Sequence, residues 1–567
     1  MVASLIQQRR FADALVRLEL EDAGGGDAFL RQTRMRHCLA RLGRLREAAE
    51  VGRRVVALSE CGPMDCLRLA RILLDLHDVE AAAPIAVRAV AEAPAAQRGI
   101  MLGPMVECLL RDPGVWAAMT GERTSLGLDL ADDRAIRQDL VRRPTLHVPL
   151  LLPPYQGTDF DHPAHMRLIE RLSSVAVDCP TPADWIGVAG FGTALKVARR
   201  AVERFAGGHG ALARARAARF VADRFSALLH PPPRGALQFV MGVPLTVGDG
   251  PWVYWFDQLI SAFQPTQMFE RTIVSAFQTP DWHFLRTLLD DRRCRLVFSH
   301  FRETPENLGR FFRSPGVVAK TRHIHPYEAP SSVVPADARA FDGPLGVLFT
   351  SSRTPRPETF FYRGGVDALA IFRRYRDKGG KGCLTLRCPL PAQLNGDWLA
   401  GILADGGITV LDGILSDADF MALRASCHIN LLPAVQVYRA SLVESMAVGL
   451  VPLAYHTPGI SEFIDNGRTG ILTHRTPPIH ALDAVGGRFS FDAPPLFAAA
   501  GPPLDQHACD RLADALLALD RDRPRLAGMA RAARASASGM IHSPKDQVFF
   551  DAAIAEQAEA ALRAERL

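Results

Sequence analysis

The stretch SLVESMAVGLVPLAYHTPGISEFIDNGRTGIL, residues 441–472, is more informative about this protein than the rest of the chain. It begins as an amphipathic helix with Glu444 in its first turns, and Gly449 ends that helix. Residues 451–454 then predict a buried strand. We expect Gly459 to open a second helix, whose unpaired backbone amides suit a phosphate or a sugar hydroxyl. The apolar face of the first helix comprises Val443, Met446, Ala447 and Leu450.

This segment resembles the donor-binding segment of family 4 glycosyltransferases, which have the GT-B fold. The family pattern is Glu-Ala-Met-Ala-x-Gly-x-Pro-Val, then Gly-Gly-x-x-Glu, then Asp-Gly-x-x-Gly-x-Leu. An ordinary helix–strand–helix unit would supply the apolar pattern, but not these glycines and carboxylates at this spacing. The matching positions are Glu444, Met446, Ala447, Gly449, Pro452, Gly459, Glu462, Gly467, Gly470 and Leu472.

The composition of the chain limits the classes of protein to which it can belong. The chain has 567 residues, of which 48% are hydrophobic, so it holds about three domains with sizeable cores. The formal net charge of +5 is small for this length and argues against a nucleic-acid partner. The first ten residues contain no apolar signal core, and no run of about 18 apolar residues follows. We therefore expect a cytoplasmic protein.

The ten cysteines do not predict a metal site. Cys61 and Cys66, like Cys383 and Cys388, are too far apart for the CxxC spacing of zinc sites, and no histidines accompany them. We interpret them as reduced, buried thiols. No cofactor and no metal are expected.

Residues 1–135 are predicted to form a helical domain of tetratricopeptide-like repeats. The segments beginning at Phe11, Leu45 and Val79 align at a 34-residue period, and an alanine follows three positions after each. This period resembles tetratricopeptide repeats, which leave a concave face for a protein partner. An alanine-rich helical bundle used for packing or dimerisation remains the alternative. We expect this domain to be a separate stack that donor chemistry does not need.

Residues 145–340 predict an acceptor-side Rossmann-like domain. Residues 146–152, 252–256 and 295–299 are strand candidates, and residues 164–172 predict a helix that follows the loop at 153–157. Thr304 is a candidate helix cap. Polar groups near strand ends, where doubly wound folds bind ligands, are Asp257, His300 and His325, although such residues are more often structural.

The segment from Lys196 to Arg219 carries seven cationic residues among alanines. A basic amphipathic helix suits the inner face of an anionic membrane, which would fit a lipid-linked acceptor. We favour the simpler interpretation, a solvated helix face.

Residues 344–540 predict the donor domain, a second Rossmann-like fold. Residues 346–350, 383–387, 408–412 and 429–433 are strand candidates, and Ser416 begins a capping box for a helix ending near Ser426. Resemblance implies that Arg353 and Arg363 neutralise the donor diphosphate, and that Gly413 faces the nucleotide base. Residues 545–567 predict a final helix that crosses back to the acceptor-side domain. The predicted fold class is α/β, GT-B, preceded by an all-α domain.

The resemblance implies a retaining transfer of a sugar from a nucleotide diphosphate donor to a protein, glycan or lipid-linked acceptor. Glu444, with Ser441 and Leu442 beside it, would hold the donor ribose. The family has a second glutamate eight positions earlier, where this chain has Gln436, and we expect Gln436 to position the sugar. Arg439 replaces a glycine of the pattern, and we expect it near the phosphates or an acidic sugar. Two alternatives stay open: another GT-B enzyme such as a sugar-nucleotide epimerase, and a binding or scaffold protein with a degenerate pocket.

Overall fold

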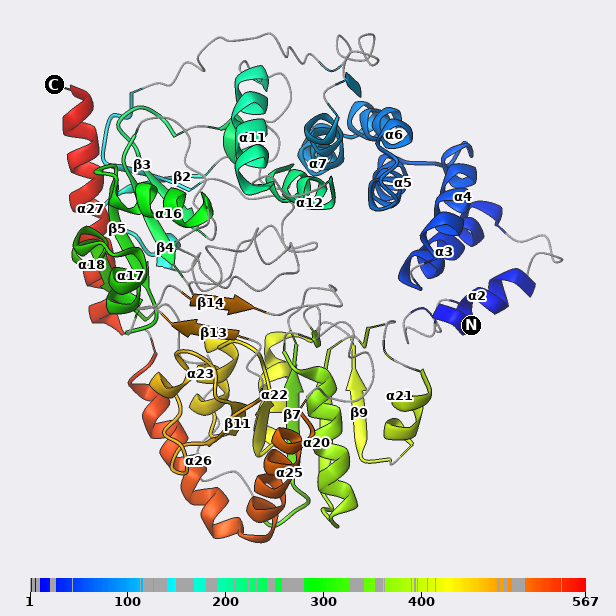
Figure 1. The fold of residues 1–567 in the computed structure, drawn as a ribbon, viewed down its shortest axis with the longest axis vertical. Helices are drawn as coiled ribbons and strands as arrows, with labels where there is room; N and C mark the ends of the chain where they lie inside the picture. The colour runs from blue at the N-terminus through cyan, green and yellow to red at the C-terminus, as the bar shows by residue number, and fades with distance from the viewer. Residues whose placement is uncertain are drawn as a thin grey trace. The chain divides into compact units, whose positions relative to one another are not determined.

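The computed structural model falls into two compact units, which Figure 1 shows as a ribbon. Unit 1 comprises Met1–Phe269, Pro280–Phe298 and Phe549–Leu567, and unit 2 comprises Glu270–Thr279 and Ser299–Val548. The structure describes residues 2, 6, 11–20, 27–42, 44–112, 114–115, 126, 140–148, 168–179, 191–206, 211–222, 225–230, 232–241, 250–256, 280–302, 304–325, 341–351, 360–361, 363–388, 390–391, 394, 396–404, 406–412, 415–476, 480–483, 488–491, 505–541 and 543–566.

The N-terminal region of unit 1 is built from helices α2 (Phe11–Leu20), α3 (Ala28–Arg41), α4 (Leu45–Val56), α5 (Pro63–Asp75), α6 (Val79–Glu92) and α7 (Ala95–Arg111). The helices α2, α4 and α6 begin at the three positions that define the 34-residue period. The alanine three residues into each, Ala14, Ala48 and Ala82, has no exposed surface. A small side chain there lets neighbouring helices approach closely. The period thus marks packing positions, while the assignment to tetratricopeptide repeats stays a prediction.

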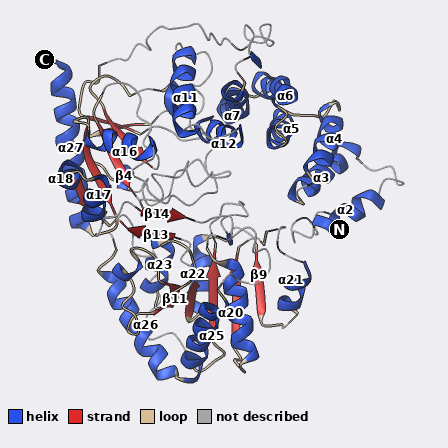
Figure 2. Ribbon diagram, viewed as in Figure 1, coloured by secondary structure: helices blue, strands red, loops and turns tan. Residues whose placement is uncertain are grey.

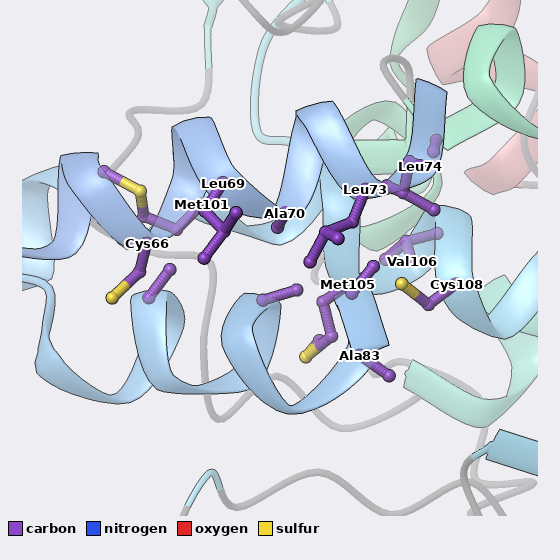
Figure 3. Close-up of a cluster of buried hydrophobic side chains, with 14 of the residues drawn as sticks. Cys66, Leu69, Ala70, Leu73, Leu74, Ala83, Met101, Met105, Val106 and Cys108 are labelled. Carbon is purple, nitrogen blue, oxygen red and sulfur yellow. The ribbon is translucent and has the colours of Figure 1, made fainter. Parts of the chain in front are cut away.

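The hydrophobic core of these helices also includes residues from later in the chain. Figure 3 shows its centre, where Leu69 and Leu73 of α5 lie near Met101 and Met105 of α7. The same cluster of buried side chains continues through α11 (Phe191–Ala206), α12 (Ala211–Ala222) and α13 (Phe225–Leu229). The expectation of a separate N-terminal stack therefore needs revision, because its core includes helices from the middle of the chain.

A buried ion cluster joins the same helices. Glu107 of α7 is fully buried, and its carboxylate accepts hydrogen bonds from Arg219 of α12 (3.0 and 3.2 Å) and from Arg71 of α5 (3.4 Å). Arg111 also donates to it. Arg219 further pairs with Asp75 at 2.6 Å. The basic segment thus forms two helices, and Arg219 points into the protein, whereas Lys196, Arg200 and Arg214 are exposed.

The first sheet is parallel where its register is recorded and has the order β2-β1-β3-β4-β5-β6. Its strands are β1 (Thr145–His147), β2 (Ala176–Asp178), β3 (Leu237–Met241), β4 (Trp252–Phe256), β5 (Cys294–Ser299) and β6 (Thr321–His323). The strands predicted at 252–256 and 295–299 are confirmed. Of the run at 146–152, the strand comprises only its first two residues, and residues 149–167 lie outside the described part. Helix α16 (Pro280–Asp290) precedes β5 in the chain, and helices α17 (Thr304–Phe312) and α18 (Pro315–Lys320) lie between β5 and β6. Thr304 is the first helical residue of α17 rather than its cap.

The last helix, α27 (Pro544–Arg566), packs in unit 1 from Phe549 onward. The ring of Phe550 is fully buried, with its centre 5.1 Å from Phe298 and 6.5 Å from Phe239. Asp551 accepts hydrogen bonds from the backbone and hydroxyl groups of Ser173 and Ser174. The C-terminal part of α27 is therefore held in unit 1 by apolar contacts with β3 and β5 and by hydrogen bonds with Ser173 and Ser174.

The second sheet lies wholly in unit 2 and is parallel, with the order β9-β8-β7-β10-β11-β12. Its strands are β7 (Gly346–Thr350), β8 (Cys383–Arg387), β9 (Ile408–Leu411), β10 (Ile429–Leu432), β11 (Val451–Tyr455) and β12 (Ile471–Thr473). Numbered within the sheet, this is 3-2-1-4-5-6, the order of Rossmann folds. The fold class is therefore α/β with two Rossmann-like sheets after a helical region, as predicted for GT-B.

Helices flank this sheet (Figure 2) and follow from local sequence. They are α20 (Gly365–Asp377), α21 (Gly396–Leu403), α22 (Asp417–Ser426), α23 (Arg439–Ala447), α25 (Gln506–Arg521) and α26 (Arg523–Ser538). Ser416 caps α22 by accepting from the Asp419 amide at 3.1 Å, which confirms the predicted cap. A two-stranded antiparallel hairpin, β13 (His480–Asp483) and β14 (Arg488–Phe491), follows β12 in the chain.

Two sequence expectations are wrong. After β11, the predicted second helix is only a 3-10 turn, η5 (Ile460–Glu462), because Phe463 and Ile464 turn into the core. The cysteines are not uniformly buried: Cys383 and Cys179 are exposed and Cys61 is half-buried. Cys383 is exposed because it is the first residue of β8, at the edge of the buried part of that strand.

Candidate active site

Strand order places the candidate site at one edge of the second sheet. The chain leaves the central strand β7 toward β8 and β9, and later returns to the other side of β7 with β10 and β11. In such sheets, ligands bind outside the carboxyl ends of the strands where the order reverses. Here that point lies between Thr350, which ends β7, and the segment 433–438, which connects β10 to α23.

A glycine brings two loops together at this point. Gly364 has φ +76°, a left-handed conformation, and a Cβ atom there would lie 1.9 Å from the Pro433 carbonyl oxygen. Only glycine lets the turn before α20 pack directly on the loop after β10. The guanidinium carbon of Arg363 lies 3.5 Å from the ring centre of Tyr438, a cation–π contact. Arg363 is thus positioned over the loop that leads into α23.

The start of α23 is fixed by polar and apolar contacts. The hydroxyl groups of Ser441 and Thr350 are 3.0 Å apart, which ties α23 to the carboxyl end of β7. Leu442 is 1% exposed and packs in the core with Met446. Gln436 is half-buried in the loop before the helix. The structure therefore places Arg363 against Tyr438 and Ser441 against Thr350, at the carboxyl ends of β7 and β10. That Arg363, Gln436, Ser441 and Leu442 form a ligand site stays a prediction.

Glu444 is oriented by a buried arginine. Its carboxylate lies 2.8 Å from the Arg424 guanidinium, whose side chain is only 5% exposed, while that of Glu444 is 35% exposed. The ring of Phe420 lies against two cations, with its centre 4.1 Å from Arg424 and 5.1 Å from Arg387. Sequence reasoning missed Arg424, Phe420 and Arg387, because no motif marks residues that meet only in the tertiary structure.

Arg439 has a different environment from the one expected beside phosphates. It is 2% exposed, and its guanidinium donates to the carbonyl oxygens of His300 (2.9 Å) and Met540 (3.1 Å). It also contacts His325 Nδ1. The guanidinium carbon lies 5.3 Å from the Phe463 ring centre. The side chain thus links α23 to three segments within unit 2.

Gly459 has φ +83° and precedes the 3-10 turn η5. A Cβ atom there would lie 3.1 Å from the Phe301 ring, so glycine permits a close contact. A single turn provides too few aligned peptide groups for the anion site expected at a helix start. Three other candidates, Arg353, Gly413 and Asp257, lie outside the described residues.

Among the residues that the structure describes, no group of three or more His, Cys, Asp or Glu side chains is placed to hold a metal ion. Within the same ranges, no helix is both long and apolar enough to cross a membrane.

No protein-family model and no curated protein sequence matches the chain. It is similar to solved structures of glycosyltransferases. The structure of Anabaena HepE with UDP and glucose is 15% identical, with 73% of this chain and 99% of that chain covered and a TM-score of 0.40. Sucrose-phosphate synthase from Thermosynechococcus elongatus is 14% identical, with 72% and 97% covered and a TM-score of 0.42. The O-GlcNAc transferase from Thermobaculum terrenum is 12% identical, with 99% and 97% covered and a TM-score of 0.37. The fold assignment rests on the strand orders given above.

Proposed function

We propose that this protein is a retaining glycosyltransferase that moves a sugar from a nucleotide diphosphate donor to a protein, glycan or lipid-linked acceptor. The observation that carries the proposal is that Arg363 lies against Tyr438, and Ser441 against Thr350, where the strand order of a Rossmann sheet reverses. The GT-B resemblance of residues 441–472 supplies the reaction class.

Each group has a distinct role in this proposal. Arg363 binds the diphosphate and stabilises the negative charge that grows on it as the sugar leaves. Glu444 accepts hydrogen bonds from the ribose hydroxyls, and Arg424 orients its carboxylate by donating a hydrogen bond to it. Gln436 offers an amide acceptor and donor to the sugar hydroxyls. Arg353 supplies the second diphosphate cation. In this proposal no metal ion is needed, because the two arginines stabilise the charge of the diphosphate.

The second candidate is a binding protein with a degenerate pocket. Arg439 favours it: the family has glycine there, and here the guanidinium is engaged with backbone carbonyls of unit 2 rather than turned to a ligand. The helical region at residues 1–135 would dock a protein partner in either case. Cytoplasmic location and contact of the basic helices with a membrane belong to the proposal as well.

Binding is tested with a panel of UDP, GDP, ADP and CDP, first by thermal shift and then by calorimetry. Glu444→Ala would leave the buried Arg424 unpaired and risk the fold. Glu444→Gln keeps an acceptor and removes the charge, so we expect at least about tenfold weaker binding of the cognate nucleotide. Glu306→Gln, which removes an exposed charge of α17, is the matched control. Unchanged affinity in Glu444→Gln would refute the assignment of Glu444.

Catalysis is tested separately by hydrolysis or transfer from the matching nucleotide sugar. Gln436→Ala should reduce the rate and leave nucleotide affinity nearly unchanged, because it contacts only the sugar in this proposal. Nucleotide binding without turnover across a broad panel of donors and acceptors would favour the binding protein.

A further inference from the structure

A small polar cavity lies in unit 2 where four segments meet. Its volume is about 230 Å³, and its wall includes His300, Arg302, His323, His325 and Glu462. Phe463, Ser536 near the end of α26, and Gly539 and Met540 beyond it complete the lining. Whole drug-sized ligands occupy pockets of roughly 300 to 1,000 Å³, so this cavity suits one small group of a ligand.

One guanidinium lines the cavity, and a second lies behind its wall. Arg302 is exposed at its mouth, and Arg439 lies behind its wall through contacts with His300, His325 and Met540. Glu462 is the carboxylate of the lining, and it already accepts the Arg302 backbone amide at 2.7 Å. Among the described residues, two guanidinium groups thus lie in or behind the wall, whereas one carboxylate lines it, and that carboxylate already accepts a hydrogen bond.

One buried polar atom of the wall lacks a hydrogen-bond partner. The Nε2 atom of His323 is buried and has no hydrogen-bond partner among the described residues. A buried polar atom without a partner is unfavourable, and native structures rarely keep one without a reason. The ring of His323 also hydrogen-bonds the His300 backbone, and a neutral ring has a single N–H. Nε2 would therefore donate to an anion's oxygen once the ring takes up a proton, which a bound anion favours.

The charges around the histidines point in the same direction. Burial, followed by Arg439 and Arg302, lowers the pKa of His323 to about 4. Burial, Arg439 and His323 lower the pKa of His325 to about 3. Asp546 of α27 acts in the opposite sense on both rings, and on His323 its effect is smaller than that of either arginine. Burial therefore lowers the pKa of both rings most, and the nearby guanidinium groups lower it further, an effect that a bound anion would oppose.

We propose that this cavity is an anion site for a phosphate group, with Arg302 and His323 as its principal ligands. A phosphate has several acceptor oxygens, and Arg302 offers the forked donors that match two of them. The phosphate belongs to a soluble phosphorylated ligand or to free phosphate, since the two share the chemistry that this wall recognises. The proposal does not depend on the reaction proposed above.

The test is calorimetric titration of the full-length protein with inorganic phosphate at constant ionic strength. We expect saturable binding that Arg302→Gln weakens about tenfold or more, because a charge-assisted pair is lost. Arg310→Gln, which removes an exposed arginine from α17 of the same unit, should bind as the wild type does. Equal affinity in all three proteins would overturn the proposal.

Three further measurements keep the result unambiguous. The phosphate titration is repeated with saturating UDP, and loss of phosphate binding there would place the anion at the nucleotide site and refute the proposal. Nuclear magnetic resonance of the histidine rings, with His323→Gln for assignment, should show that phosphate raises the pKa of His323; an unchanged pKa would refute its role. Glucose 6-phosphate replaces phosphate in the last titration. Tighter binding that still depends on Arg302 would identify a phosphorylated ligand as the source, and equal binding would identify free phosphate.

Discussion

Helix α20 carries a glycine in the left-handed region at each end, and the two provide a controlled test of the candidate site. Gly364 precedes the helix with φ +76°, and Gly379 follows it with φ +87°. A Cβ atom at Gly364 would lie 1.9 Å from the Pro433 carbonyl oxygen and 2.6 Å from its carbon, whereas a Cβ atom at Gly379 would meet nothing within 4 Å. Alanine at either position has the same backbone strain, and only alanine at 364 collides with backbone.

The magnitudes follow from this difference. Placing an L-residue in the left-handed region costs about 1–2 kcal/mol, which is the whole effect expected for Gly379→Ala. Gly364→Ala adds overpacking against a rigid carbonyl, typically about 1–3 kcal/mol more. Because about 1 kcal/mol shifts Tm by roughly 2–4 °C in a domain of this size, the melting temperatures of the two variants should differ by several degrees.

The assay measures thermal unfolding and nucleotide affinity on the same proteins. Gly364→Ala must push the loop at Pro433 away, so it should also weaken binding of the cognate nucleoside diphosphate, while Gly379→Ala should keep wild-type affinity. Equal melting temperatures and equal affinities for the two variants would show that the contact between the α20 turn and the β10 loop does not build the site.

Three further outcomes are expected. Glu107→Gln should lower stability by about 3–5 kcal/mol in thermal or chemical unfolding, because it leaves buried arginines uncompensated, whereas Glu92→Gln, at an exposed pair, should change it by less than about 1 kcal/mol. A chain beginning at residue 140 should be poorly soluble and bind a hydrophobic dye, because α11–α13 would lose the helices that complete their core; a soluble, cooperatively folding fragment would contradict this. Because the pKa of His323 is lowered to about 4 in the folded protein, this side chain takes up a proton mainly in the unfolded chain as pH falls from about 6.5 toward 4. The free energy of unfolding should therefore decrease over that range. The variant His323→Gln should flatten the dependence of Tm on pH, and an unaltered dependence would contradict the lowered pKa.

Local sequence was enough for most of the second sheet. The strands at 346–350 and 383–387 and the helix that Ser416 caps lie where apolar runs and a capping box predict them. Buried parallel strands are continuous apolar segments, so their positions depend on few neighbours. The 34-residue period was equally local, because it fixes which alanine of each helix is buried. The extent of the turn at Ile460 was predicted wrongly, since packing of Phe463 and Ile464, not local propensity, ended it.

The amino-acid sequence was sufficient to predict the fold class and the 34-residue spacing of the helices, whereas a ligand site at Ser441 and Glu444 stays a prediction. Only the tertiary structure decided which groups meet there. Arg424 orients Glu444 from another helix, and Tyr438 lies under Arg363 across two loops. It also decided that Arg439 is an internal cation. The physical reason is that periodicity reports which face of an element is buried, whereas ion pairs and ring contacts depend on chain segments brought together by packing.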